Sequence, residues 1–157
     1  MKWVTRERPK IDRLACPWLI RRLIDPDSEI LYVPAADVTQ VAREQEAIAF
    51  DIPGVKLTHD GPLCSFAAFL KIHELQDPAL HELAVIVRAA DTDTLDQSPQ
   101  AAGLLAITLG LSDNIPDDPE LLQVGILVYD ALYTWCCCLR SERHGWSPEP
   151  QVMQAIR

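Results

Sequence analysis

The segment Thr5–Asp25, TRERPKIDRLACPWLIRRLID, combines a basic run with the first apolar helix of the chain. It overlaps KWVTRE (2–7), whose alternating side chains predict a short half-buried strand. Apolar residues then recur at helical spacing, so we expect a helix that begins between Asp12 and Pro17 and ends near Asp25. Asp12 is its candidate N-cap. We expect the rest of the chain to be organised around this segment.

Half of the basic residues lie at the start of the chain. The first 25 positions hold seven of the fourteen Lys and Arg residues and carry a net charge near +4, in a chain of formal net charge −9. Arg6, Arg8, Lys10 and Arg13 lead into a helix, where guanidinium and free backbone N–H groups can bind a tetrahedral oxyanion such as phosphate or sulfate. The alternative is a solvated face paired with some of the many carboxylates.

The overall composition indicates one acidic globular domain. At 157 residues, with 48% hydrophobic and 24% charged residues, the chain is long enough to bury a core. The acidic balance argues against direct nucleic-acid binding, which rests on phosphate neutralisation. Five cysteines do not form a secreted disulfide framework, so we expect five free thiols and a cytoplasmic location.

Two segments bear on membranes. The start, MKWVTRERPK (1–10), has charges where a signal peptide needs an apolar core. The segment 121–139 is long enough to cross a bilayer, but Gln123 and Asp130 interrupt it. We therefore expect a buried core helix there and no membrane association.

The later pattern is mostly helical. The elements that we expect are strands at 29–35 and 47–55, helices at 37–46 and 64–75, and three helices that open at Asp77-Pro78, Ser98-Pro99 and Asp118-Pro119. The second of these three is expected to end at Gly110, and the third to be the central helix of the core. The fold class is therefore α+β, with a small N-terminal sheet covered by a mainly helical C-terminal two-thirds. We expect one domain over 1–140 and a polar, Pro-containing tail over 141–157.

A turn and a helix end carry further candidate ligands. His59 and Cys64 lie five residues apart across a turn, so they can share a metal ion or form a nucleophile–base pair. A loop histidine that bonds to its own turn is the plainer alternative. Asp91 and Asp93 end a predicted helix, where carboxylates are unfavourable, so this cluster needs Arg88, a divalent cation or solvent.

Asp130 and a cysteine run lie in the last apolar helix. Asp130 stands among apolar residues, so we expect it to be buried and paired with an arginine of the first segment, most plausibly Arg13. The successive cysteines 136–138 point about 100° apart on a helix and cannot converge on one metal ion.

Four ordered stretches, KWVTRERPKIDRLACPWLIRRLID (2–25), FDIPGVKLTHDGPLCSF (50–66), VRAADTD (87–93) and PQAAGLLAITLGLS (99–112), resemble the chromate-resistance family known from the C-terminal domain of ChrB-type regulators. The resemblance spans roughly residues 2–135. It implies a link to bacterial chromate resistance and to chromate-responsive control of efflux. The DNA-associated N-terminal domain of the regulator has no counterpart in this sequence, so we expect a stand-alone form without direct nucleic-acid binding.

Two positions depart from the family pattern. Ala67 stands where members have an acidic residue, and Arg88 stands where longer relatives have a histidine. If the family site is a metal held by those side chains, this chain keeps His59 and Asp91 but lacks two ligands. We therefore expect anion binding to outlast metal binding.

The resulting interpretation is a chromate-resistance accessory or sensor domain that binds chromate, sulfate or a divalent metal ion. The alternatives are a metal-dependent or thiol-based enzyme acting on a small molecule, and a structural accessory that binds a partner protein. A homo-oligomer is compatible with all three. We expect one cleft with Arg6 and Arg13 on its anion side, His59 and Asp91 on its floor, and Cys64 at its edge.

Overall fold

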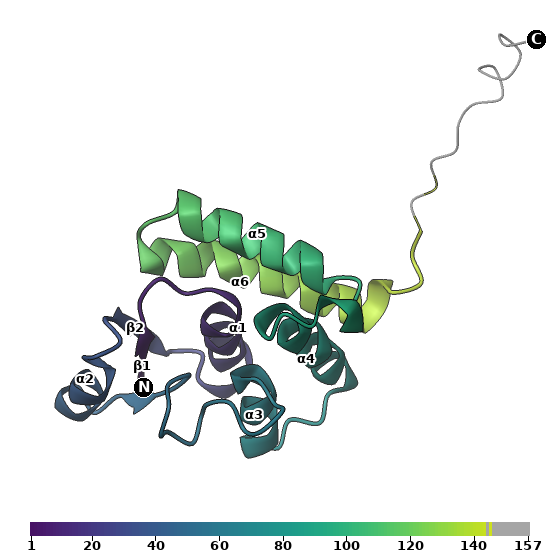
Figure 1. Ribbon diagram of the computed structural model, residues 1–157. Helices are drawn as coiled ribbons and strands as arrows, with labels where there is room; N and C mark the ends of the chain where they lie inside the picture. Colours follow the sequence, from purple (N-terminus) through teal and green to yellow (C-terminus); the bar gives the residue numbers. More distant parts are fainter. Residues whose placement is uncertain (144, 146–157) are drawn as a thin grey trace, which may run out of the picture.

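Three short parallel strands form the sheet of this protein. The computed structural model, which describes residues 1–143 and 145, contains β1 (Lys2–Arg6), β2 (Glu29–Val33) and β3 (Ile48–Ala49) in the order β2-β1-β3. The short helix α2 (Val38–Glu44) lies beside the sheet, at the end of the molecule away from the other helices (Figure 1).

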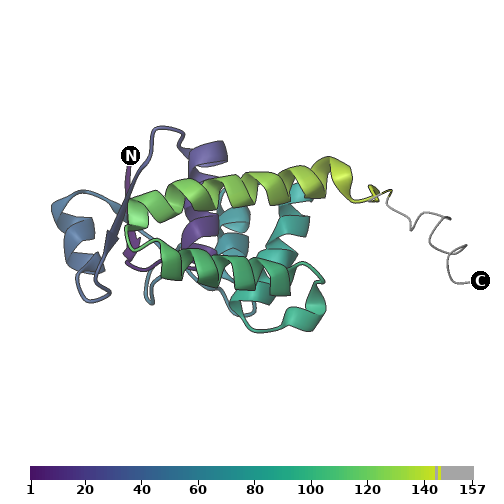
Figure 2. The same ribbon diagram turned by 90° about the horizontal axis from the view of Figure 1, so that it is seen from above.

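Helices make up the rest of the described chain. They are α1 (Ile11–Leu19) with a π-helical turn η1 (Ile20–Ile24), α3 (Ser65–Ile72), α4 (Pro78–Asp91), a 3₁₀ turn η2 (Leu95–Gln97), α5 (Ala101–Asn114), and α6 (Asp118–Thr134) with a π-helical turn η3 (Trp135–Leu139). The pair α5 and α6 lies across α1 and α4, and α3 lies on their other side (Figures 1 and 2). This confirms the expected α+β fold, a small N-terminal sheet with a helical remainder.

Helix α1 is the centre of the core, and it begins earlier than expected. It starts at Ile11, so Pro17 lies inside the helix rather than in its first turn. Pro17 has no N–H to donate to the carbonyl of Arg13. The hydroxyl of Tyr32 on β2 donates to that carbonyl instead, at 2.8 Å. A strand side chain therefore replaces the helical hydrogen bond that proline removes.

Helix α6 is a peripheral helix with one buried face, so its expected place at the centre of the core is wrong. Gly125 packs so closely on α1 that a Cβ there would lie 3.2 Å from Leu14. The opposite face is open, and Leu127 is 66% exposed. Within the described residues, Asp118–Leu139 is the one helix long and apolar enough to cross a membrane, and a third of its most apolar window is buried.

Several predicted element boundaries shift. Strand β3 has two residues because Asp51 turns the chain at φ 50°, and its N–H donates back to the carbonyl of Leu57. Helix α5 begins at Ala101 and passes through Gly110 without ending. Asp117, rather than Asp118, caps α6 by accepting from the N–H of Glu120. The cap of α4 by Asp77 is as expected.

Asp130 pairs with an arginine of the first segment, but the partner is Arg22 and not Arg13. The Arg22 guanidinium donates to both carboxylate oxygens, at 2.9 and 2.6 Å, and Trp18 Nε1 donates at 2.8 Å. The Asp130 side chain is 36% exposed, so the expected full burial is also wrong. Asp130 lies on a flank of α6 rather than on its buried face, where it contacts the end of α1 and the π-helical turn that follows it.

All five cysteines are free, as expected. Cys16, Cys64 and Cys136 are buried, whereas Cys137 and Cys138 are exposed. A cytoplasmic location is compatible with this pattern and stays a prediction. The predicted tail, 141–157, lies mostly outside the described residues.

Candidate functional site

The candidate site lies at the carboxyl ends of β1 and β3. The chain leaves β1 through α1 to reach β2 on one side, while β3 pairs with β1 on the other side. In open parallel sheets, ligands bind outside the carboxyl ends of the strands, at the point where the strand order reverses. Here the order reverses between β1 and β3. Arg6 ends β1, Asp51 follows β3 by two residues, and Asp12 lies in the first turn of α1.

Asp12, His59 and Asp91 bring three potential ligand atoms together. All three atoms lie within 4.8 Å of one another. His59 Nε2 is 3.5 Å from Asp12 Oδ2 and 3.3 Å from Asp91 Oδ2. Two ligand atoms on one ion, at about 2.1 Å and at tetrahedral to octahedral angles, lie about 3.0–3.4 Å apart. The separation of 3.3 Å lies within this range and that of 3.5 Å lies just above it, so the three atoms are close to neighbouring positions around a single ion.

Asp12 is fixed by the N-terminus of α3. Its carboxylate accepts from the backbone N–H groups of Ser65, at 2.6 Å, and Phe66, at 3.4 Å. Its side chain is only 2% exposed. Burial raises the pKa of Asp12 well above its ordinary value, and the carboxylates of Asp91 and Asp51 raise it further. The helix end holds this carboxylate in place although its surroundings disfavour its charge.

Asp51 forms a second layer behind these three side chains. It accepts from Ser65 Oγ at 2.7 Å and from Arg6 Nη2 at 3.1 Å, and its Oδ2 lies 3.6 Å from Arg13 Nε. Its Oδ1 is 3.8 Å from His59 Nε2. The two arginines therefore reach the site through Asp51, whose backbone adopts a left-handed conformation that aspartate tolerates better than most residues.

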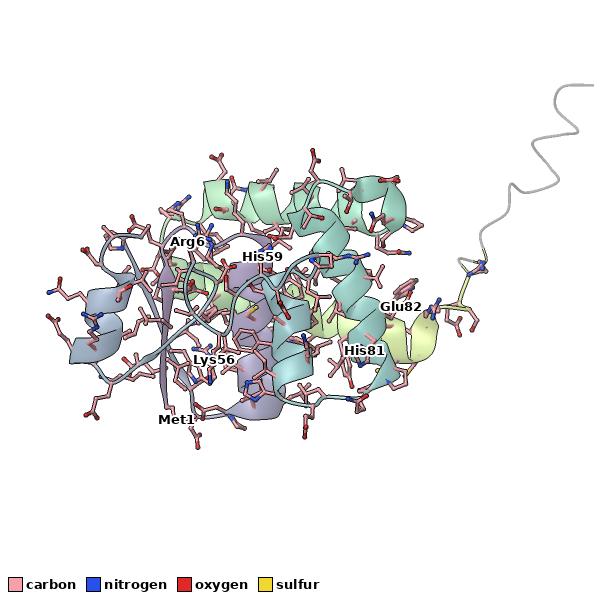
Figure 3. The ribbon with its side chains drawn as sticks, turned by 60° about the horizontal axis from the view of Figure 1, so that its bottom comes forward. Met1, Arg6, Lys56, His59, His81 and Glu82 are labelled. Atoms are coloured by element: carbon pink, nitrogen blue, oxygen red, sulfur yellow. The ribbon has the colours of Figure 1, made fainter. Side chains whose placement is uncertain are left out.

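His59 stands at the open side of the site. Its side chain is 44% exposed, whereas Asp12 is buried beneath it. The tight turn after it is closed by reciprocal backbone bonds between Asp60 and Leu63, with Gly61 at φ +58°. Figure 3 shows Arg6 and His59 on the same side of the molecule. His59 is therefore the most exposed of the three side chains.

The predicted basic group divides in two. Arg6 and Arg13 join the site through Asp51. Arg8 turns away, and its guanidinium donates to the carbonyls of Ser112, Ile115 and Pro116 at the end of α5. Lys10 is exposed and lines a separate hollow with Arg8. Arg8 thus satisfies the carbonyl groups at a helix C-terminus, a structural role.

Cys64 lies beside the site but outside the group of three ligand atoms. It is the buried residue that precedes α3, and burial together with the Asp12 carboxylate raises the pKa of its thiol. A thiol that stays protonated is a poor nucleophile, and Cys64 is not among the side chains whose ligand atoms converge. The position expected for Cys64 is occupied by Asp12, which sequence reasoning missed because it was assigned to helix capping. Asp12 lies in the first turn of α1, where an acidic residue is ordinary, so the sequence held no local signal for this role.

Of the carboxylates near the end of α4, Asp91 alone lies in the site. The partner of the Asp91 carboxylate is His59 and not Arg88, which donates to Gln97 Oε1 at 2.8 Å. Burial raises the pKa of Asp91, and His59 opposes this shift. Asp93 and Asp96 are exposed and take no part in the site. Neither Ala67, in the first turn of α3, nor Arg88 supplies a ligand here.

Carboxylates outnumber guanidinium groups at the site. Three carboxylates converge, and the two guanidinium groups are already committed to one of them and to backbone carbonyls. Imidazole nitrogen with carboxylate oxygen suits first-row divalent metals such as Mn²⁺, Fe²⁺, Co²⁺ or Zn²⁺. A cation at this point would stabilise carboxylates that repel each other in its absence.

Comparison with known proteins agrees with the resemblance found in the sequence. The family model for ChrB, C-terminal domain, matches residues 3–136. Protein ChrB of Cupriavidus metallidurans is 35% identical over 134 residues, which cover 85% of this chain and 40% of that protein. The chain therefore spans two-fifths of the length of this curated relative. No solved structure matches the chain.

Proposed function

Because the chain belongs to the family of ChrB C-terminal domains, we propose that it serves chromate resistance as a metal-binding domain, with Asp12, His59 and Asp91 as the ligands of a divalent cation. The observation that carries this proposal is the separation of 3.3 and 3.5 Å between His59 Nε2 and the two carboxylate oxygens. These three side chains come from α1, a loop and the end of α4.

The surroundings of the ligands support a built site. Metal ligands are commonly oriented by hydrogen bonds from a surrounding layer of residues. Here the N-terminus of α3 orients Asp12, and Ser65 Oγ together with Arg6 orients Asp51. Three ligands leave coordination positions open, because Mn²⁺ and Fe²⁺ take up to six ligands and Zn²⁺ at least four.

A free oxyanion fits the same place less well. Arg6 and Arg13, the basic side chains at the site, are paired with Asp51, and Arg13 also donates to the carbonyls of Arg6 and Glu7. A bound oxyanion would have to displace Asp51 while facing Asp12 and Asp91. Like charges at these distances cost several kcal/mol at low effective dielectric. We therefore reverse the expected order and place metal binding ahead of anion binding.

A bound cation would connect segments that are far apart in the sequence. Asp12 follows the first strand, His59 lies in the loop before α3, and Asp91 ends α4. An ion that binds the folded state alone stabilises it by RT ln(1 + [L]/Kd). Binding of the ion is thereby coupled to the stability of the contact between these three segments. A metal-responsive domain requires such a coupling.

The test is calorimetric titration of metal-free protein with MnCl₂ and ZnCl₂. We expect one ion per chain, and at least a tenfold loss of affinity in His59→Ala and in Asp91→Asn. Asp93→Asn is the matched control, because Asp93 is an exposed carboxylate two residues from Asp91. Unchanged binding in His59→Ala and Asp91→Asn would refute the site, and no binding of either metal would refute the function.

A further inference from the structure

Strand β2 has one paired edge and one open edge. The N–H of Glu29 donates to the carbonyl of Met1 at 2.9 Å, and the carbonyl of Val33 accepts from Glu7 at 2.8 Å, so these residues face β1. Backbone groups alternate along a strand, which places the N–H and C=O groups of Ile30 and Tyr32 on the opposite edge. Among the described residues β2 pairs with β1 alone, and no turn or loop hydrogen bond uses these four groups.

A groove of about 610 Å³ runs along this open edge. Its walls are β2, Val41 of α2 with the following Gln45, and residues 116–119 around the start of α6. Figures 1 and 2 show the sheet between α2 and this end of α6. The groove thus follows the strand between two helical walls, and an extended segment can lie in it.

Strand β2 lacks three of the features that protect open edges. Proteins protect open edges with lysine, proline or bulges. The sequence of β2, EILYV (29–33), contains none of these residues and pairs with β1 in unbroken register. The edge is therefore free to accept another strand.

The charge of the groove selects the kind of strand. Glu29, Asp117 and Asp118 line it, and none of its lining residues is basic. Asp118 Oδ2 accepts from the N–H of Arg8, whereas its Oδ1 is buried and has no hydrogen-bond partner among the described residues. The three carboxylates give the groove a negative lining, which favours a strand that carries basic residues.

We propose that the open edge of β2 binds an extended segment of a partner protein, rich in lysine or arginine, as a fourth strand of the sheet. Backbone hydrogen bonds to Ile30 and Tyr32 hold the added strand in place. The carboxylates of Glu29, Asp117 and Asp118, which we call the acidic rim, favour basic residues on that strand. A second copy of this chain fits less well, since two acidic rims of a chain with net charge −9 would face each other.

The probe is a synthetic acetylated and amidated peptide, Lys-Val-Lys-Val-Lys-Val-Lys, titrated into the full chain at fixed ionic strength. Three matched peptides accompany it. In one, glutamate replaces lysine, and in the other two, alternate backbone amides are N-methylated in each of the two possible phases. We expect at least tenfold weaker binding of the glutamate peptide and of one methylated peptide. Amide exchange at Ile30 and Tyr32 should slow when the lysine peptide binds.

The protein variant neutralises the rim without removing its hydrogen-bond acceptors. Glu29→Gln, Asp117→Asn and Asp118→Asn together should weaken binding of the lysine peptide at least fivefold. The matched control neutralises three carboxylates elsewhere, with Glu74→Gln, Asp93→Asn and Asp96→Asn.

Three results would overturn the proposal. Equal binding of the lysine peptide and both methylated peptides would mean attraction by charge alone. An equal loss of affinity in the control variant would mean the same. Slow exchange at Ile30 and Tyr32 in a dimer without peptide would assign the edge to a second copy of the chain.

Discussion

The hydrogen bond from the Tyr32 hydroxyl stands in for the helical bond that Pro17 removes, so Tyr32→Phe should lower the stability of the fold. The hydroxyl of Tyr32 is the donor to the carbonyl of Arg13 at a point where α1 has no N–H to offer. Removing it leaves a carbonyl without a partner in a part-buried position. An unsatisfied group of this kind costs about 1–3 kcal/mol. For a chain of this size, each kcal/mol lowers the melting temperature by about 2–4 °C.

The assay is denaturation by guanidinium chloride, carried out as a double-mutant cycle with Pro17→Ala. Alanine restores the N–H that proline lacks, so the Arg13 carbonyl regains a donor within the helix. Tyr32→Phe should therefore cost about 1 kcal/mol less when Pro17 is already replaced by alanine. An equal cost of Tyr32→Phe in both backgrounds, or a cost below about 0.5 kcal/mol in the wild type, would refute this account of α1.

Three further predictions follow from side-chain environments. Asp130→Ala should cost about 1 kcal/mol, and not the 3–5 kcal/mol of a buried pair, because the Arg22–Asp130 pair is about half exposed; a loss above about 3 kcal/mol in chemical denaturation would contradict this. Asp77→Ala should cost about 1–2 kcal/mol because it removes the cap of α4 and the acceptor of the Tyr133 hydroxyl, and Asp77→Ser should recover the cap but not the bond from Tyr133. Hydrogen bonds from Tyr133 and the N–H of Ala79 lower the pKa of Asp77, so its contribution is present above the ordinary aspartate pKa and is lost as pH falls through the lowered folded value; the gap between the melting temperatures of wild type and Asp77→Ala should therefore narrow on acidification, and a constant gap would contradict this. Thiol titration should find five free cysteines, with Cys137 and Cys138 reacting first in the folded protein; fewer than five after denaturation without reductant would mean that disulfides have formed.

Local signals in the sequence predicted the elements that depend on local chemistry. The Asp77-Pro78 pair indicated the start of α4, and amphipathic spacing indicated α3. Alternation indicated the position of β1, but the expected half-burial is wrong, because Trp3, Val4 and Thr5 are all buried in this central strand. Predictions failed where a distant residue decides the outcome. Pro17 is tolerated inside α1 because Tyr32 supplies a donor. Helix α5 continues past Gly110 because Arg8 satisfies the carbonyls at its end.

Some residues of the candidate site could likewise be predicted from local sequence, and others could not. Histidine in a turn and a carboxylate at a helix end are local anomalies, and they mark His59 and Asp91 as candidate ligands from the sequence alone. The role of Asp12 depends on α3, more than fifty residues later in the chain, whose first N–H groups bind its carboxylate. No local pattern distinguishes such a carboxylate from a helix cap. Arg8 and Lys10 looked like members of an anion site because charge spacing does not say which way side chains turn.

Crystals of the protein soaked in MnCl₂, with diffraction measured at a wavelength where manganese scatters anomalously, test the central claim most directly. We predict one anomalous peak about 2.0–2.3 Å from His59 Nε2 and from the nearest carboxylate oxygens of Asp12 and Asp91. A crystal of Asp91→Asn should show no peak or a much weaker one. A strong peak remote from these three side chains, or no peak at all in the wild type, would contradict the claim. So would a sulfate or chromate ion bound between Arg6 and Arg13 with Asp51 displaced.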